Sequence, residues 1–376
     1  MNLYLGEGIL AQHKLAKLLP RFVVVIVVLC GFLTHTPQVS ASPSGVDWFS
    51  ISAGFQHTCA LDNADRISCW GRNQYGQLGN GTTEQSDLPK LIKTTGALSG
   101  VHFKQVSASY THSCALTVAG VAYCWGLNDQ GQLGNTAVKT QTAVPVPVDV
   151  TGDLNGVVLT SIDTGINHTC ALSDAGAVYC WGANDDGQLG TGTLDYSPTP
   201  VAVDTSGVLS GLTIQELSVG SLVTCVLDSS GAVYCWGYGH EGEIGDGRGA
   251  AINPSPIAVD TSGVLSGVTI AHISVGDSSV CAVDSNGLVY CWGLNASGQL
   301  GNGTTDDSFS PIQVNAEANL STQSAPDVSV GGAFACARTD MGLASCWGDG
   351  TQGQLGNAST NNSKVPVDVS QSGNSV

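Results

Sequence analysis

Short apolar segments alternate with polar turns along the chain from about residue 48 to residue 369. In the stretch 200–253 these segments cover 200–203, 214–219, 224–227 and 232–236, and Gly, Asp and Ser occupy the turns between them. Segments this short and this rich in β-branched and aromatic residues predict β-strands. Long stretches with a helical period do not occur, so the pattern predicts an all-β fold and argues against a helical solenoid.

The pattern recurs six times with a period of 55 or 56 residues, and each copy contains a Cys followed ten residues later by Cys-Trp-Gly. Four short strands per period are typical of a β-propeller blade. We therefore predict that residues 42–376 form a single β-propeller of six four-stranded blades, with seven blades as the alternative. The segments 49–53 and 365–369 match complementary parts of one period, so we expect the N- and C-terminal strands to pair and close the ring.

The paired cysteines lie at corresponding positions of a predicted hairpin. In the third copy, a turn centred on Ala175 places Cys170 opposite Cys180 and Leu172 opposite Val178, so that the two cysteines share a face. Directly opposed residues lie within disulfide distance, and an even number of cysteines suits an exported protein. Buried free thiols are the alternative. A zinc site would need a second pair of ligands near the two thiols, and no copy offers one. The predicted disulfides join Cys59 to Cys69, Cys114 to Cys124, Cys170 to Cys180, Cys225 to Cys235, Cys281 to Cys291 and Cys336 to Cys346.

The N-terminus has the features of a secretory signal peptide. Three basic residues precede the apolar run 22–33, and a small-residue cleavage pattern follows at 39–41. The run is shorter than the roughly 20 residues that a transmembrane helix needs. We therefore predict a signal peptide over residues 1–41 and a mature protein that is secreted or held in the cell envelope, without membrane insertion. An uncleaved anchor and lipid attachment at Cys30 are the alternatives.

The composition is acidic, with 12 Lys and Arg against 30 Asp and Glu and a net charge of −18. Removal of residues 1–41 leaves nine basic and 29 acidic residues. Such a surface repels phosphate groups, so nucleic acid and anionic membranes are poor partners. The charge either maintains solubility or steers cationic partners. We expect a monomer whose partner is an unidentified protein.

A second glycine-rich turn follows each Cys-Trp-Gly, as in Gly71-Arg72-Asn73-Gln74-Tyr75-Gly76-Gln77-Leu78-Gly79. The corresponding turns are 126–134, 182–190, 237–245, 293–301 and 348–356. With its Ala-Leu strand and its Val-x-x-Trp-Gly strand, this repeat resembles that of the regulator of chromosome condensation family over about residues 48–369. The resemblance implies a β-propeller, which in that family commonly has seven blades.

The resemblance also implies two kinds of function. One is guanine-nucleotide exchange on a small nuclear GTPase with chromatin docking, and the other is inhibition of secreted β-lactamase by the loops of a bacterial propeller. Export and acidity fit the second better than the first. We thus predict an exported protein–protein interaction scaffold that binds its partner through loops on one propeller face. Exchange activity is the first alternative, and a propeller hydrolase or lyase is the second.

No catalytic or metal-binding constellation emerges from the sequence, so we predict no enzyme activity, no cofactor and no metal. The turn 184–187 resembles part of a calcium loop but lacks the Glu at its twelfth position. His57, His112 and His168 each lie two residues before the first Cys of their copy. Imidazoles packed and hydrogen-bonded between blades are expected there rather than catalytic bases. Copies four to six have Val223, Ser279 and Phe334 at this position.

The fourth copy departs most from the others, in the turn 238–248. Charged and aromatic residues replace Asn, Gln and Leu there. We therefore predict a partner-contact loop, with sequence drift as the alternative. Its candidate contacts are Tyr238, His240, Glu241 and Arg248. Trp48 precedes the first predicted strand without an aromatic counterpart in the other copies, so we expect it to pack at the ring closure or to form an exposed contact.

Overall fold

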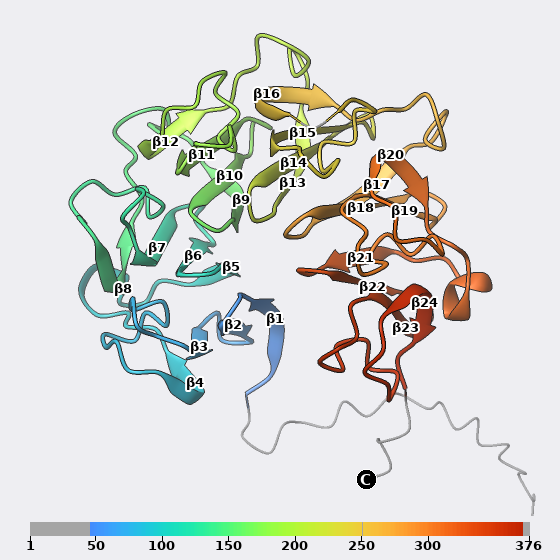
Figure 1. The fold of residues 1–376 in the computed structure, drawn as a ribbon. Coiled ribbons are helices and arrows are strands. Elements are labelled where there is room, and N and C mark those ends of the chain that lie inside the picture. Colours follow the sequence, from blue (N-terminus) through green and yellow to red (C-terminus); the bar gives the residue numbers. More distant parts are fainter. Residues whose placement is uncertain (1–45, 250, 371–376) are drawn as a thin grey trace, which may run out of the picture. The chain divides into compact units, whose positions relative to one another are not determined.

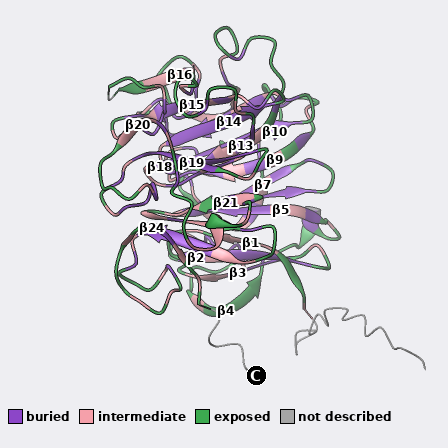
Figure 2. Ribbon diagram, turned by 90° about the vertical axis from the view of Figure 1, so that its right-hand side faces the viewer, coloured by how far each residue is buried: buried purple, intermediate pink, exposed green. Residues whose placement is uncertain are grey.

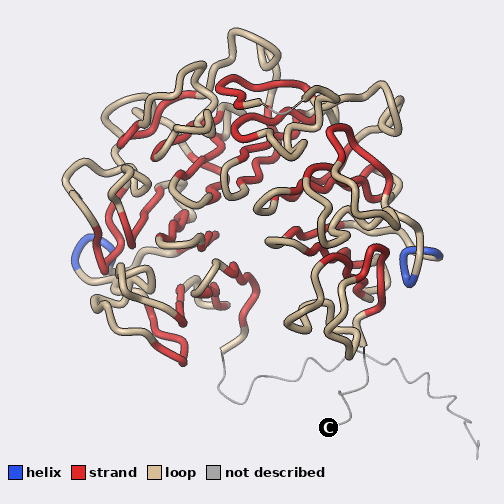
Figure 3. Tube along the Cα trace, in the orientation of Figure 1, coloured by secondary structure: helices blue, strands red, loops and turns tan. Residues whose placement is uncertain are grey.

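The computed structural model describes residues 46–249 and 251–370. Within these residues the chain forms 24 β-strands and two short 3-10 helices, η1 (Gly96–Leu98) and η2 (Ala318–Ser321) (Figure 3). The prediction of an all-β fold is therefore confirmed. The predicted signal peptide, residues 1–41, lies outside the described residues, as does Cys30.

Six antiparallel four-stranded sheets, the blades, follow one another in chain order (Figure 1). In each blade, four consecutive strands are hydrogen-bonded in the order in which they occur in the sequence. The first three blades hold β1 (Trp48–Ala53), β2 (His57–Asp62), β3 (Ile67–Gly71), β4 (Ser86–Leu91); β5 (Phe103–Ala108), β6 (His112–Thr117), β7 (Ala122–Leu127), β8 (Gln141–Pro147); β9 (Leu159–Thr164), β10 (His168–Ser173), β11 (Val178–Gly182) and β12 (Ser197–Ala202). The last three hold β13 (Ile214–Val219), β14 (Val223–Asp228), β15 (Val233–Tyr238), β16 (Ile252–Ala258); β17 (Ile270–Val275), β18 (Ser279–Asp284), β19 (Val289–Gly293), β20 (Ser308–Gln313); β21 (Asp327–Val330), β22 (Phe334–Arg338), β23 (Ala344–Gly348) and β24 (Ser363–Asp368). The prediction of six blades, rather than seven, is confirmed for the described part of the chain.

The predicted pairing of the N- and C-terminal strands is wrong. β1 pairs with β2 in the first sheet, and β24 pairs with β23 in the last sheet. Each repeat supplies all four strands of its own blade, so no blade in the described part of the chain combines strands from both ends. In Figure 1 the first blade, in blue, stands apart from the sixth blade, in red.

The hydrophobic cores lie between neighbouring blades. Five clusters of buried residues each combine side chains from two consecutive blades. Between the first two blades, Leu61 and Leu78 share a cluster with Phe103 and Trp125. Figure 2 shows the strands mostly buried and many of the connecting turns exposed. Because burial of large apolar side chains is the main stabilising term in folding, each blade depends on its neighbour for stability.

A disulfide joins the second and third strands of every blade. The register of β10 and β11 places Cys170 opposite Cys180 and Leu172 opposite Val178, as the sequence predicts. All six predicted pairs are bonded, and their Cα atoms lie 4.0 to 4.1 Å apart. The prediction of paired disulfides is confirmed.

Two kinds of loop share one face of the propeller. Because neighbouring strands are antiparallel, the loop between the first and second strands of a blade lies on the same face as the loop between the third and fourth. Hydrogen bonds connect these loops: Arg72 N donates to the Gln56 carbonyl at 2.8 Å, and Tyr238 N donates to the Leu222 carbonyl at 3.0 Å. We name this side the turn face. It includes the predicted partner-contact loop between β15 and β16.

Candidate functional site

The loop 238–248 has a backbone frame set by packing between blades. Gly245 adopts a φ of +73°, and a Cβ at this position would lie 2.7 Å from Nε1 of Trp292. Glycine therefore lets the indole of the fifth blade press against the turn. The carbonyl of Glu243 accepts the Trp292 Nε1–H at 2.9 Å. The variable side chains of this loop thus extend from a backbone that the neighbouring blade holds in place.

Two of the four predicted contact residues come together. The rings of Tyr238 and His240 lie 4.8 Å apart at an interplanar angle of 38°. His240 is exposed, and Tyr238 is half-buried. Burial and the charge of Asp185 raise the pKa of Asp186, on the third blade, while His240 opposes this shift. Aromatic, imidazole and carboxylate groups from two blades therefore share one patch of the turn face.

The other two predicted contact residues differ in their surroundings. Arg248 is 77% exposed, and its Nε lies 3.6 Å from a carboxylate oxygen of Asp246. Both residues line a cavity of about 210 Å³ together with Phe309 of β20. A cavity below about 300 Å³ suits one inserted side chain better than a whole small-molecule substrate. Glu241 is half-buried, and no hydrogen bond, ion pair or ring contact among the described residues joins Arg248 to the ring of Tyr238 or His240.

Glu243 is a buried acid in this loop that the sequence reasoning did not single out. Its side chain is 1% exposed. One carboxylate oxygen accepts the Glu241 N–H at 2.9 Å, and the other has no hydrogen-bond partner. Burial raises the pKa of Glu243 to about 7. The signal was available, because the corresponding residue is Gln in the other five copies: Gln77, Gln132, Gln188, Gln299 and Gln354.

Three histidines bridge consecutive blades, as expected. Nε2 of His57 lies 2.7 Å from the Ser113 hydroxyl, and Nε2 of His112 lies 2.9 Å from the Thr169 hydroxyl. His168 makes the third such contact, at 3.2 Å. Burial lowers the pKa of His57 to about 4 and those of His112 and His168 to about 3. These histidines are neutral structural groups rather than proton-transfer catalysts near neutral pH.

The later blades lack this histidine, and in two of them the position that faces it in the next blade also lacks a hydroxyl. The hydroxyl that faces each histidine comes from the next blade, one residue after the histidine position of that blade. This partner position holds Ser113, Thr169 and Thr224 in blades two to four, and then Val280 and Ala335. Val223 and Val280 are the next pair, and Ser279 and Ala335 are the last, in which the buried Ser279 hydroxyl has no hydrogen-bond partner. The loss of histidine after the third blade thus coincides with the loss of the hydroxyl that faces it in the next blade.

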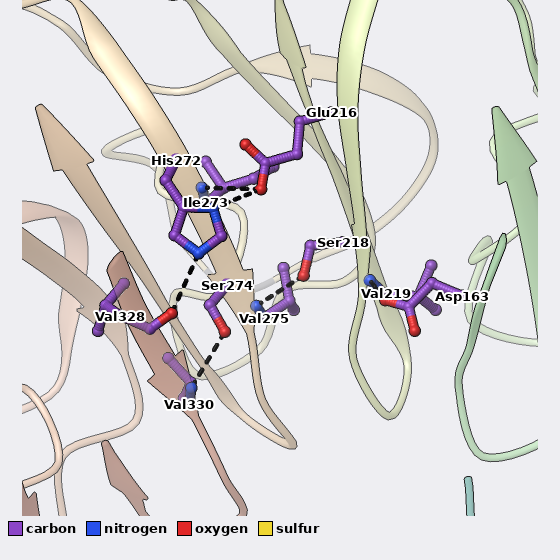
Figure 4. Close-up of polar contacts among 10 residues, drawn as sticks. All are labelled: Asp163, Glu216, Ser218, Val219, His272, Ile273, Ser274, Val275, Val328 and Val330. Carbon is purple, nitrogen blue, oxygen red and sulfur yellow. Dashed lines mark hydrogen bonds and ion pairs between the residues drawn. The ribbon is translucent and has the colours of Figure 1, made fainter. Parts of the chain in front are cut away.

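A channel along the axis is lined by the innermost strands of all six blades and has a volume of about 840 Å³. Polar side chains on these strands accept backbone N–H bonds from the next blade (Figure 4). Ser52 accepts from Ala108 at 2.9 Å, Asp163 from Val219 at 2.8 Å, Ser218 from Val275 at 3.0 Å, and Ser274 from Val330 at 3.0 Å. The polar lining of the channel is thus largely committed to holding the blades together.

His272 makes a further link between blades four, five and six. Its Nδ1 lies 2.6 Å from a carboxylate oxygen of Glu216, and its Nε2 lies 3.2 Å from the Val328 carbonyl (Figure 4). Burial lowers the pKa of His272, but the hydrogen bond and charge of Glu216 outweigh burial, so the net shift is upward.

The mouth of the channel on the turn face is crossed by side chains that the sequence reasoning missed. The Tyr110 hydroxyl donates to Asp277 at 3.2 Å, from the second blade to the fifth. Ser221 donates to the other oxygen of the same carboxylate. Phe55, 62% exposed, stacks on Tyr110 with ring centroids 4.3 Å apart. No sequence signal identifies this contact, because Tyr110 and Asp277 are 167 residues apart.

The described residues contain no group of three or more His, Cys, Asp or Glu side chains placed to hold a metal ion. The turn 184–187 instead has a structural role, since Asn184 bonds the backbone of Leu189, Thr193 and Asp195. In the described part of the chain, no helix has the length and apolar character that spanning a membrane would require.

Fold and repeats together define the class: a β-propeller whose blades each carry a Cys-Trp-Gly strand followed by a Gly-Gln-Leu-Gly-like turn. Two sequence profiles described as regulator of chromosome condensation (RCC1) repeat match the chain. One matches residues 66–116, 119–172, 175–227, 286–338 and 344–376, and the other matches 50–77, 103–132, 159–188, 214–243 and 270–299. The chain belongs to the RCC1 repeat family.

Several known proteins and solved structures are similar to this chain. The ultraviolet-B receptor UVR8 of Arabidopsis thaliana is 30% identical in an alignment of length 368, with coverage of 85% of this chain and 80% of UVR8. The human E3 ubiquitin-protein ligase HERC2 is 32% identical over 257 residues, which are 68% of this chain and 5% of HERC2. The structure of human WBSCR16 matches with a TM-score of 0.76 at 21% identity, covering 86% of this chain and 82% of the other. Yeast RCC1 (Prp20), solved bound to Kap60, matches with a TM-score of 0.73 at 20% identity, covering 86% and 75%.

Proposed function

We propose that this protein is an exported protein-interaction scaffold that binds its partner through the loop 238–248 on the turn face. The observation that supports this most is the combination of a backbone fixed by the fifth blade with side chains found in no other copy. A rigid loop displaying Tyr and Arg side chains has the composition of an interaction hot spot. The small cavity beside Arg248 would receive one side chain of the partner.

The disulfides support a location outside the cytoplasm. Six disulfides indicate an oxidising environment outside the cytoplasm. Export directed by residues 1–41 is part of the proposal and agrees with that chemistry. A protein partner is in keeping with the relative yeast RCC1, whose solved structure is a complex with Kap60.

A loop exchange tests the proposal while preserving the fold. The fifth blade carries Leu294, Ala296, Ser297 and Thr304 at the positions of the four candidate contacts. The variant Tyr238→Leu/His240→Ala/Glu241→Ser/Arg248→Thr therefore replaces the fourth loop's side chains with ones already accepted by the same turn. The mature protein and the variant are each used as bait for proteins of the producing cell's medium or envelope.

The proposal expects the native chain to retain a specific protein and the variant to bind it at least tenfold more weakly. The matched control, Thr304→Ala, alters the corresponding position of the fifth loop and leaves binding unchanged. Equal retention by native chain and variant would place the contact elsewhere, and no retained protein across a range of salt concentrations would contradict a binding function.

A further inference from the structure

The five interfaces between consecutive blades are built alike. In each, the indole Nε1–H of the motif Trp donates to a turn carbonyl of the preceding blade at 2.8 to 3.0 Å. These bonds run from Trp125 to Gln77, Trp181 to Gln132, Trp236 to Gln188, Trp292 to Glu243 and Trp347 to Gln299. The turn's Leu or Ile shares a core cluster with that indole, and its Gly allows close approach. An indole and a Gln-Leu-Gly turn are therefore two halves of one contact.

The first blade carries the indole half without a turn. Trp70 is half-buried, whereas its five counterparts are fully buried, and no turn carbonyl of the described residues accepts its Nε1–H. Trp48 is 43% exposed and Ile51 is 67% exposed. In β5 the corresponding residues, Phe103 and Val106, are 1% and 4% exposed. The sheet face that a preceding blade would cover is thus open, and Trp48 has an aromatic counterpart after all.

The outermost strand of the first blade is open in the same way. Pro89 of β4 is exposed. The prolines that correspond to Pro89 are all buried in the other blades: Pro145, Pro200, Pro256, Pro311 and Pro366. Exposed apolar residues on one sheet face are typical of an interaction site.

The sixth blade carries the turn half without an indole. Gln354 is half-buried, whereas its counterparts in the other blades are buried. The three atoms nearest to a Cβ on Gly356 would all belong to Val369, but the corresponding glycine of the fifth blade packs against Trp347. The channel along the axis is bordered by both Ile51 and Gln354, so one occupant can reach the open face of the first blade and the open turn of the sixth.

We propose that the space between the first and sixth blades binds a β-hairpin of another polypeptide that carries a Gln-Leu-Gly turn of this same repeat class. The turn carbonyl accepts the Nε1–H of Trp70, and the Leu covers the indole and Ile51. Gly is required next, because the indole lies within about 3 Å of that position in the established interfaces. The site continues the series of interfaces that the chain already makes five times, and it does not involve the loop 238–248.

Two other occupants would also bury the exposed indole of the first blade and the exposed turn of the sixth. A second copy of this chain presents such a turn on its sixth blade, but its fifth blade would then approach the place of the first copy's sixth blade. Closure of the chain's own first blade on its sixth would also unite the two halves. A separate hairpin needs neither a rearranged ring nor overlapping blades, and the test distinguishes all three.

The probe is an oxidised synthetic peptide with the sequence of residues 112–134 and Trp125→Phe, so that only the protein's indoles fluoresce. In the free chain, iodide is expected to quench Trp48 and Trp70 and to leave the five buried indoles unaffected. The peptide should remove this quenching in a saturable titration. The peptide that also carries Gly134→Val, and the protein variant Trp70→Phe, should each weaken binding at least tenfold.

Each remaining outcome overturns the proposal. Protection of Trp70 from iodide in the free chain means that the ring closes on itself. Self-association that is lost in Trp70→Phe assigns the site to a second copy. Equal binding of both peptides, or no saturable binding, rejects recognition of the turn. Loss of partner binding in the loop 238–248 variant has no bearing on this titration, so the two proposals fail separately.

Discussion

At the scale of single residues, three buried histidines make the free energy of unfolding depend on pH. His57, His112 and His168 have folded pKa values of about 3 to 4 because burial disfavours their charged form. The unfolded chain binds protons below a pKa of about 6.5, so stability is full above that pH and falls as the pH drops toward 4. The loss amounts to about 3 kcal/mol per histidine at a pH of about 4.5.

Replacing one polar pair by the apolar pair of a later blade should reduce this dependence. The double variant His112→Val/Thr169→Val copies the Val223 and Val280 contact between the fourth and fifth blades. Urea unfolding followed between about pH 7 and 4.5 should show a smaller loss of stability for this variant than for the native chain. Ser279→Ala changes no titrating group and should preserve the native slope, whereas an unchanged slope in the double variant would contradict the assignment.

Glu243 is expected to act in the opposite direction. Its folded pKa of about 7 lies above its unfolded value because burial favours the protonated form. Stability from this residue is therefore present below about pH 4.5 and is lost as the pH rises toward 7, by about 3 kcal/mol. Glu243→Gln restores the residue of the other copies and should stabilise the protein at pH 8 more than at pH 5. Equal stabilisation at both values would show that the carboxyl is not buried in its protonated form.

At the scale of elements, the disulfide in each hairpin is a local staple. Removal of one pair by Cys170→Ala/Cys180→Ala should lower the free energy of unfolding by about 2 kcal/mol, since the closed loop is short. Mass spectrometry with alkylation before and after reduction should find the twelve described cysteines of the native chain protected until reduction. Alkylation of all twelve cysteines without reduction would contradict the six disulfides.

The turn glycine that faces an indole should tolerate no side chain. A Cβ on Gly190, whose φ is +67°, would lie 2.6 Å from Nε1 of Trp236. Gly190→Ala should therefore destabilise the protein by more than about 2 kcal/mol through strain and displaced packing. Gly207→Ala is the matched control, because nothing lies within 4 Å of a Cβ there. Similar melting temperatures for the two variants would exclude this packing role.

The hairpins were predictable because their information is local. A turn of fixed length and alternating apolar residues determine the register of β10 and β11, and with it the opposition of Cys170 and Cys180. The role of the Gln-Leu-Gly turns was not predictable in this way. Gly190 meets an indole 46 residues further along the chain, and the sequence shows the glycine but not what packs against it.

At the scale of the whole molecule, the period gives the number of blades but not how the series ends. The first and last segments look like two parts of one period, and this pattern alone predicts a shared blade. The structure instead completes each blade within its repeat, so the two end faces stay open. The candidate loop is visible in the sequence as a departure from the repeat. The contact between Tyr110 and Asp277 is not, because it forms only when the folded ring brings the second and fifth blades together.

Site-specific photo-crosslinking tests the proposed function most directly. A photoreactive phenylalanine analogue is placed at Tyr238 or, as the matched control, at Leu294 of the fifth loop, and the protein is irradiated in the producing culture. We expect position 238 to yield one discrete crosslinked protein and position 294 to yield none. The same product from both positions, or no product from position 238, would contradict a partner site on the loop 238–248.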